Sequence, residues 1–124
     1  MADMNKTLKK RQELGFEMKE ITEEVLVGCP KHLLNWLKYA EPAYRYKGSR
    51  EEDWNFRTEF IRKLYNFTCA SCKKTEEDCS RSEFHTHHII PLSEGGDNAF
   101  ENLVCLCEKC HKKIHPGIIF ERII

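Results

Sequence analysis

The sequence lacks a long hydrophobic run. Of its 124 residues 40% are hydrophobic and 32% are charged, and no apolar stretch approaches the roughly 20 residues that a transmembrane helix needs. The segment from Met1 to Leu14 is polar and rich in lysine, without the apolar stretch of a secretory signal peptide. Internal repeats and low-complexity segments are also missing. We therefore expect a cytoplasmic protein that has no contact with a membrane.

Net charge is missing as well. The chain has 20 Lys and Arg and 20 Asp and Glu, so its formal charge at pH 7 is zero. The charges are divided unevenly, because residues 1–50 carry a net +3 and residues 51–124 a net −3. Many proteins that bind nucleic acid are basic. By charge alone, the second part should bind phosphate only weakly.

A disulfide framework is not expected. The number of cysteines, seven, is odd, and the chain shows no signal peptide that would direct it to an oxidising compartment. They are Cys29, Cys69, Cys72, Cys79, Cys105, Cys107 and Cys110. Their grouping into Cys-x-x-Cys pairs points to a metal instead.

Two kinds of periodicity divide the chain. In the first half, apolar spacing predicts helices over residues 5–27, 31–40 and 54–65, with a polar linker at 41–53 that contains Pro and Gly. The long first helix depends on one apolar face, made of Leu14, Met18, Ile21 and Val25. The second half changes character. The segments Phe84–Pro91 and Asn102–Cys107 are typical of strands, and Glu108–His115 of a helix that Pro116 and Gly117 end.

Two Cys-x-x-Cys pairs, 34 residues apart, carry the strongest metal signal. They are Cys69 with Cys72 and Cys107 with Cys110. Two such turns can surround one ion tetrahedrally, and thiolates favour zinc. Four thiolates leave no open position, so this zinc should be structural. The alternative is a set of reduced, buried cysteines that act as small apolar residues. Cys79 is a weak rival ligand, and Cys105 is expected in the core.

Five of the six histidines fall within 31 residues. They are His85, His87, His88, His111 and His115. His111 and His115 share one helix face and can hold one ion. His87 and His88 end a strand and should point to opposite faces, which suits one metal ligand and one base. Hydrolysis of a phosphodiester needs both, a neutral imidazole to take a proton and an ion to neutralise phosphoryl charge. The alternative is a chance cluster.

These residues resemble the signature of the HNH endonuclease family. The resemblance is carried by residues 87–96 (HHIIPLSEGG), Asn102-Leu103 and residues 106–111 (LCEKCH), and residues 54–72 are similar to the helix and first zinc knuckle that often precede them. It spans about residues 47–115. It implies an α+β fold with a ββα-metal core, in which a hairpin and a helix surround one catalytic divalent ion. We therefore divide the chain into a helical N-terminal extension, 1–46, and an HNH nuclease domain, 47–124.

The resemblance also implies roles for single residues. His88 is the general base, and Asn102 braces the loop that orients it. His87 and His111 are metal ligands, and His115 lies where some members have a third. His87 replaces the commoner Asp, so the site should favour Zn, Ni, Co or Mn over Mg.

For several other residues the sequence gives weaker evidence of a role. Lys112 and Lys113 border the site and are candidate nucleic-acid contacts, although a solvated helix face is an equal alternative. Trp54 is expected in the core rather than as a platform for a base, and so are Trp36, Tyr39 and Phe60. Gly95 and Gly96 are expected at positive φ.

The predicted function is that of a metal-dependent HNH endonuclease that hydrolyses phosphodiester bonds, most simply in double-stranded DNA. The cofactors are one catalytic divalent ion (Mg, Mn, Ni, Co or Zn) and one structural Zn. A prokaryotic or phage origin fits this function, and a double-strand break would require a homodimer or a larger assembly. The alternative is a non-catalytic, zinc-stapled module that binds nucleic acid or serves as an assembly subunit of a phage or restriction system. The apolar run 118–124 could pack on the extension or on another subunit.

Overall fold

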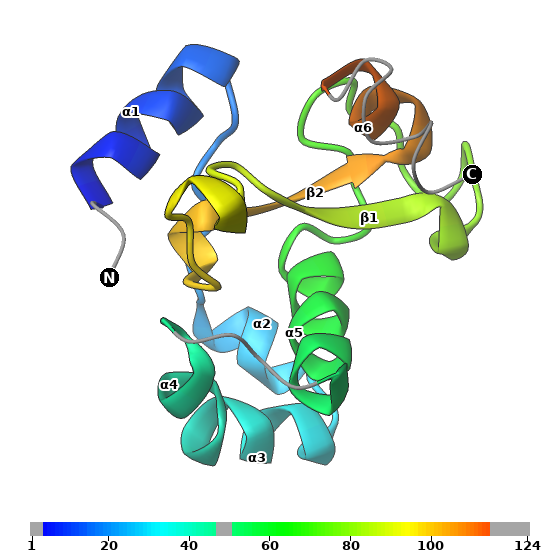
Figure 1. The fold of residues 1–124 in the computed structure, drawn as a ribbon. Coiled ribbons are helices and arrows are strands. Elements are labelled where there is room, and N and C mark those ends of the chain that lie inside the picture. Colours follow the sequence, from blue (N-terminus) through cyan, green and yellow to red (C-terminus); the bar gives the residue numbers. More distant parts are fainter. Residues whose placement is uncertain (1–3, 47–50, 115–124) are drawn as a thin grey trace.

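The structure, a computed structural model, describes residues 4–46 and 51–114, in which helices surround one small β-hairpin (Figure 1). The helices are α1 (Met4–Leu14), α2 (Glu23–Val27), α3 (Lys31–Tyr39), α4 (Glu41–Tyr44), α5 (Glu51–Leu64) and α6 (Glu108–Ile114), and the strands are β1 (Phe84–His88) and β2 (Leu103–Cys107). Short 3-10 turns lie at η1 (Arg81–Glu83), η2 (Leu92–Glu94) and η3 (Phe100–Asn102). The predicted α+β class with a ββα order is confirmed. Within the described residues, no helix is both long and apolar enough to cross a membrane.

The hairpin lies between two helices. β1 pairs antiparallel with β2, so that Phe84 is opposite Cys107 and His88 is opposite Leu103. Every residue of β2 is buried, because α5 contacts the hairpin from one side and α6 from the other (Figure 1). α6 follows β2 without a loop, which fixes its position against the strands.

The prediction of one helix over residues 5–27 is wrong. α1 ends at Leu14, and Gly15 takes a left-handed conformation with φ +74°, which only glycine adopts at little cost. The backbone N–H of the buried Phe16 then donates to the Arg11 carbonyl at 3.0 Å. A second helix, α2, starts after Thr22, whose hydroxyl accepts from a backbone N–H in the first turn at 3.3 Å. The turn at Gly15 and the burial of Phe16 therefore end the first helix before the predicted apolar face is complete.

Of the other predicted elements, the helices near residues 31–40 and 54–65 are confirmed as α3 and α5. The linker over 41–53 is wrong in part, because it contains α4 and the first turn of α5. A linker was expected because the segment is polar. Two of its polar residues, Glu41 and Asp53, are instead buried. Within α5, Ile61 and Leu64 are buried as expected, whereas Trp54 is only half-buried.

A buried arginine joins the helices to the loop before β2. Arg57 of α5 donates to Glu41 Oε2 at 2.9 Å, to the Asn98 carbonyl at 2.9 Å and to Asp53 Oδ2 at 3.3 Å. Trp36 of α3 donates its indole N–H to the same Asp53 carboxylate at 2.7 Å. Since a buried charge is tolerated only when it is paired and hydrogen-bonded, these contacts hold α3, α4, α5 and the loop together.

A second buried arginine attaches α1 to the hairpin. Arg11 donates to the carbonyls of Glu101 at 2.9 Å and Leu103 at 3.1 Å, and it also contacts the hydroxyl of Tyr65. Burial lowers the pKa of its guanidinium to about 10, against the opposing effect of Glu101, so the group is still charged at neutral pH. Thr7, one turn earlier on the same face, is buried as well. One face of α1 is therefore fixed against the start of β2.

Replacing Arg57 with Leu should destabilise the fold by about 3–5 kcal/mol, because two buried carboxylates lose a cationic partner. Urea denaturation measures this free energy of unfolding. The matched control is Arg62→Leu on the same helix, since Arg62 is half-buried and its Nε donates to the Thr58 carbonyl at 3.4 Å. We expect that control to change stability by about 0.5 kcal/mol. Equal losses in the two variants would contradict a special role for the buried network.

Candidate active site and metal centre

The four paired cysteines come together in space. They are Cys69, Cys72, Cys107 and Cys110, and their sulfur atoms all lie within 4.8 Å of one another. The sulfurs of Cys72 and Cys107 are 3.7 Å apart. An ion bound by four thiolates at about 2.3 Å has sulfur–sulfur edges of about 3.8 Å. The cluster therefore has the size and the donor chemistry of a tetrahedral thiolate metal site.

The ionisation of these thiols also suits a cation. Burial alone would raise the pKa of Cys69, but backbone hydrogen bonds from Cys107 and Cys72 outweigh it and bring that pKa to about 7. Burial raises the pKa of Cys110 to about 12. Without a cation, the Cys110 thiol therefore stays protonated at neutral pH. A bound divalent ion would deprotonate it.

The two remaining cysteines near the cluster lie outside it. Cys105 is fully buried in the core, as predicted, and burial raises the pKa of its thiol to about 12. Cys79 contacts the Thr75 carbonyl through its sulfur at 3.7 Å. In the described part of the chain, the group of three or more metal-binding side chains whose ligand atoms all lie within 4.8 Å of one another is that of the four paired cysteines.

Three histidines meet between β1 and α6. The rings of His87 and His111 are 5.3 Å apart between centroids and nearly perpendicular, and the rings of His85 and His111 are 5.4 Å apart and stacked. His85 and His87 share a strand face, and α6 carries His111 against them. His87 is buried. His115, the expected third ligand, lies outside the described residues.

His88 points to the other side of the hairpin. Its ring stacks on Trp54 of α5, with centroids 5.1 Å apart and an angle of 11° between the planes. Its Nε2 is 2.8 Å from Oδ1 of Asn98. Because an amide oxygen only accepts, this bond assigns a proton to Nε2 and leaves the lone pair of the neutral ring on Nδ1. Burial lowers the pKa of His88, although the hydrogen bond that its Nε2 donates to Asn98 opposes the shift, so the ring is neutral near pH 7.

Asn102 closes the loop that follows β1. Its side-chain oxygen accepts from the Ile90 N–H at 2.8 Å, and its amide donates to the carbonyls of Ile90 at 3.0 Å and Asp97 at 2.8 Å. It is 1% exposed. All three bonds are internal to the loop, so Asn102 holds its two ends together.

Sequence reasoning missed the two side chains that contact His88. Asn98 follows Gly95-Gly96-Asp97 in the loop, and this position after a glycine pair was the signal that could have drawn attention to it. Trp54 precedes His88 by 34 residues, and no local pattern connects residues that far apart. It was expected in the core, whereas it lies half-buried over the histidine ring.

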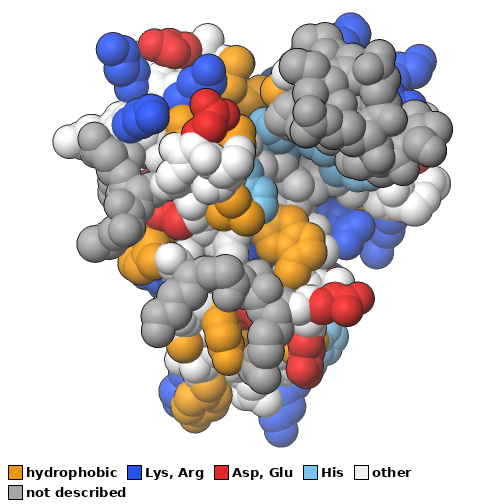
Figure 2. Space-filling model, viewed as in Figure 1, with side chains coloured by type: hydrophobic (Ala, Val, Ile, Leu, Met, Phe, Trp, Pro, Cys, Tyr) orange, Lys and Arg blue, Asp and Glu red, His pale blue; other side chains and the backbone are white. Residues whose placement is uncertain are grey.

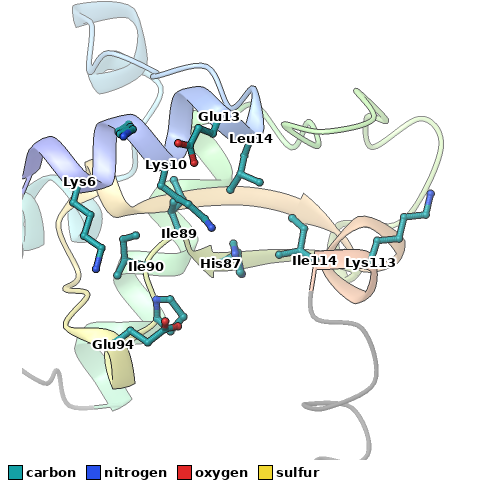
Figure 3. A pocket seen from close by; sticks show the side chains of 12 residues that line it. Lys6, Lys10, Glu13, Leu14, His87, Ile89, Ile90, Glu94, Lys113 and Ile114 are labelled. Carbon is teal, nitrogen blue, oxygen red and sulfur yellow. The ribbon is translucent and has the colours of Figure 1, made fainter.

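A cleft of about 690 Å³ opens between α1, the end of β1 and α6 (Figure 3). Its lining includes His87 but not His88, which agrees with the opposite directions of the two rings. The lining residues are Lys6, Lys9, Lys10, Glu13, Leu14, His87, Ile89, Ile90, Pro91, Glu94, Lys113 and Ile114. In Figure 2, histidine side chains (pale blue) lie in a hollow on this face of the molecule. Lysines and arginines (blue) gather beside it, at the upper left.

The two candidate lysines of α6 face different surroundings. Lys113 lines the cleft that contains His87. Lys112 forms an ion pair with Glu108 at 3.4 Å and lines a smaller cavity next to Cys79 and Cys107. Lys113 is therefore the lysine of this pair that borders the histidines.

The glycine pair in the loop serves two different purposes. Gly95 has φ +91°, as expected. For Gly96 the expected positive φ is wrong. A Cβ there would lie 1.8 Å from the Ile90 carbonyl oxygen, so this position requires glycine because the backbone on the other side of the loop comes so close.

Comparison with known proteins agrees with this architecture. A model of the HNH endonuclease family matches residues 69–117. Similar proteins include anaredoxin of Nostoc sp. strain PCC 7120, 35% identical over 57 residues, a stretch that covers 46% of this chain and 68% of anaredoxin. The type IV methyl-directed restriction enzyme EcoKMcrA of Escherichia coli K12 is 52% identical over 50 residues, which cover 38% of this chain and 18% of the enzyme.

A third relative, the Zorya protein ZorE of Escherichia coli strain Crooks, is 33% identical over 69 residues, or 54% of this chain and 18% of ZorE. No solved structure matches the chain. The chain belongs to the HNH endonuclease family, through its domain at residues 69–117. It spans about two thirds of anaredoxin but less than a fifth of EcoKMcrA and ZorE.

Alanine at the two glycines should separate strain from collision. Gly95→Ala forces a left-handed conformation on alanine and should cost about 1–2 kcal/mol. Gly96→Ala should cost more, about 3 kcal/mol or above, because backbone must move to admit the methyl group. Urea denaturation of both variants measures the difference. A smaller loss of stability for Gly96→Ala than for Gly95→Ala would contradict the close contact between Gly96 and the Ile90 backbone.

Proposed function

We propose that this protein is a metal-dependent endonuclease that hydrolyses phosphodiester bonds in double-stranded DNA. The observation that carries the proposal is a histidine, His88, held in one orientation by Asn98 and Trp54 at the end of β1. The neighbouring residue, His87, meets His111 on the other side of the same strand. The candidate base and a candidate ion ligand are thus consecutive residues of an HNH domain, on opposite faces of one strand end.

His88 is the general base of this proposal. A base that works near neutral pH must be unprotonated there and must be held in one orientation. The lowered pKa of His88 meets the first need, and the Asn98 bond with the Trp54 stack meets the second. Nδ1 then takes the proton of the attacking water. Asn98 and Trp54 act through His88 as positioning residues, and Asn102 keeps in shape the loop that carries Asn98.

His87 and His111 would hold the catalytic divalent ion, with His115 as a third ligand. Two imidazoles that share one ion at about 2.0–2.1 Å have ring centroids about 5 Å apart, and the 5.3 Å between these rings fits that arrangement. Such an ion supplies Lewis-acid stabilisation of the phosphate and of the leaving oxygen. An imidazole-rich site favours Zn, Ni, Co or Mn over Mg.

The cysteine cluster would hold a structural zinc ion. It joins the turn after α5 to the end of β2 and to α6, so it ties together the first and last parts of the HNH domain. With four sulfur ligands the ion has no open position for a substrate. Its contribution is to folding, and the chemistry belongs to the histidines.

Replacing His88 with Ala should lower the rate of DNA cleavage by about 10²–10⁴-fold, the usual contribution of a general base. The assay incubates supercoiled plasmid with purified protein and Mg, Mn, Co, Ni or Zn. The control is His32→Ala, because His32 is exposed and pairs with Glu59, away from the hairpin. The proposal fails if the unmodified protein cuts with none of these metals, or if the His88 variant cuts equally well.

The second candidate is a non-catalytic zinc-stapled module that binds nucleic acid or serves in an assembly. One observation favours it. Anaredoxin, about two thirds of whose length the chain covers, has a name that states no nuclease activity. Binding of DNA without cleavage in the plasmid assay would support this candidate in place of the first.

Cys72→Ser should remove one equivalent of zinc per chain and lower the unfolding temperature by roughly 10 °C or more, because several kcal/mol of folding free energy depend on the ion. Mass spectrometry of the dialysed protein counts the metal, and calorimetry gives the temperature. The control is Cys79→Ser, which changes a nearby thiol outside the cluster. If this control loses the zinc, or the Cys72 variant keeps it, the ligand set is wrong.

A further inference from the structure

We propose that α1 is a phosphate-binding arm, which holds the backbone of duplex DNA along the cleft next to His87. This inference rests on the proposed function and adds to it the source of affinity for the substrate. Three lysines of α1, Lys6, Lys9 and Lys10, line the same cleft as His87. They belong to the N-terminal extension, which lies outside the residues that match the HNH family.

The lysines occupy one stripe of the helix. Lys6 and Lys10 are one turn apart, and Lys9 lies beside them, so all three point to the same side of α1. Figure 3 shows the Lys6 and Lys10 side chains extending from α1 toward Ile89 and Ile90 at the edge of the cleft. All three lysines are exposed. Their charges therefore remain available to a ligand in the cleft.

The neighbouring stripe of α1 fixes this arrangement in place. Thr7 and Arg11 are buried, and Arg11 bonds to the carbonyls of Glu101 and Leu103 at 2.9 and 3.1 Å. Leu103 is also the residue opposite His88 in the hairpin. The lysine stripe is thus held at a set position relative to the candidate catalytic strand. A binding arm on a rigid element loses little conformational entropy when it takes up its ligand.

The charge around the cleft matches a polyanion. Four lysines and two glutamates line it, so its net charge is +2 with His87 neutral. By contrast, residues 51–124 as a whole carry a net −3. The positive charge that phosphate needs at this site therefore comes mainly from α1.

The distribution of the lysines favours a nucleic-acid backbone over a small phosphate ion. Lysines lie along α1 on one side of His87, and Lys113 of α6 also lines the cleft. A strand that passes between them would place a phosphate at His87 and further phosphates against the lysines. Exposed lysines that neutralise successive phosphates release counterions, which gives binding its steep dependence on salt.

The experiment measures binding in a His88→Ala background, so that cleavage plays no part. A fluorescent DNA duplex of random sequence is titrated with protein at salt concentrations of about 50 to 200 mM, and the logarithm of affinity is plotted against the logarithm of salt. The test variant carries Lys6→Gln, Lys9→Gln and Lys10→Gln. Glutamine keeps the helix propensity of lysine, and calorimetry checks that the fold is retained.

The matched control removes the same charge from the same extension, with Lys19→Gln, Lys31→Gln and Lys38→Gln. These lysines are not in the cleft lining, and the last two are on α3, at the opposite end of the molecule from α1 (Figure 1). We expect the test variant to flatten the salt slope by about 2–3, since each lost phosphate contact removes about 0.9. The control should flatten it by less than about 1.

Equal slopes in the test and control variants would overturn the binding arm, whatever the plasmid assay shows. A flattened slope in the test variant alone supports it, even if the unmodified protein fails to cut plasmid DNA. In that case the nuclease proposal fails and the DNA-binding role of α1 stands. The two results are therefore read independently.

Discussion

The rest of the structure depends on the buried guanidinium of Arg57. It bonds to Glu41 on α4, to Asp53 on its own helix and to the carbonyl of Asn98. Burial alone would raise the pKa of Glu41, but hydrogen bonds from Arg45 and Arg57 outweigh it and keep that pKa below its ordinary value. The carboxylate is therefore ionised inside the protein. A buried charge with partners on several elements fixes all of them at once.

The Asn98 backbone links this network to the candidate site. While its carbonyl accepts from Arg57, its side chain bonds to His88 at 2.8 Å. Trp54, one turn before Arg57 on the same helix, stacks on the same ring. The orientation of His88 therefore follows from how α5 is held, and α5 is held by helices of the N-terminal extension. A segment outside the family signature thus supports the residue that we propose as its base.

The alternation of strand β1 sends its last two histidines to opposite faces of the hairpin. His87 faces α6 and His111, whereas His88 faces α5 and Asn98. Both residues nevertheless lie at the end of β1, where the loop begins. α6 carries His111 and Cys110, so the same helix lies against the cysteine cluster and the histidine group. The proposed zinc would set the position of α6 and hence the spacing of the proposed metal ligands.

Sequence pattern alone determined the elements that have local causes. The ββα order, the pairing of the Cys-x-x-Cys turns and the opposite directions of His87 and His88 follow from spacing and from strand alternation. The left-handed turn at Gly95 has a local cause too. The structure contains these features because each depends on residues close in the chain or on a repeated motif.

Tertiary structure decided what depends on distant contacts. The apolar stripe of residues 5–27 is broken because Phe16 is buried and Gly15 turns the chain. Polar Glu41 lies inside because Arg57, 16 residues later on another helix, neutralises it, and the buried Asp53 accepts from Trp36 of α3. Trp54 and Asn98 meet at His88, and the lysines of α1 reach the His87 cleft, only once the chain has folded. Burial and charge pairing act between residues far apart in sequence, and no local pattern records them.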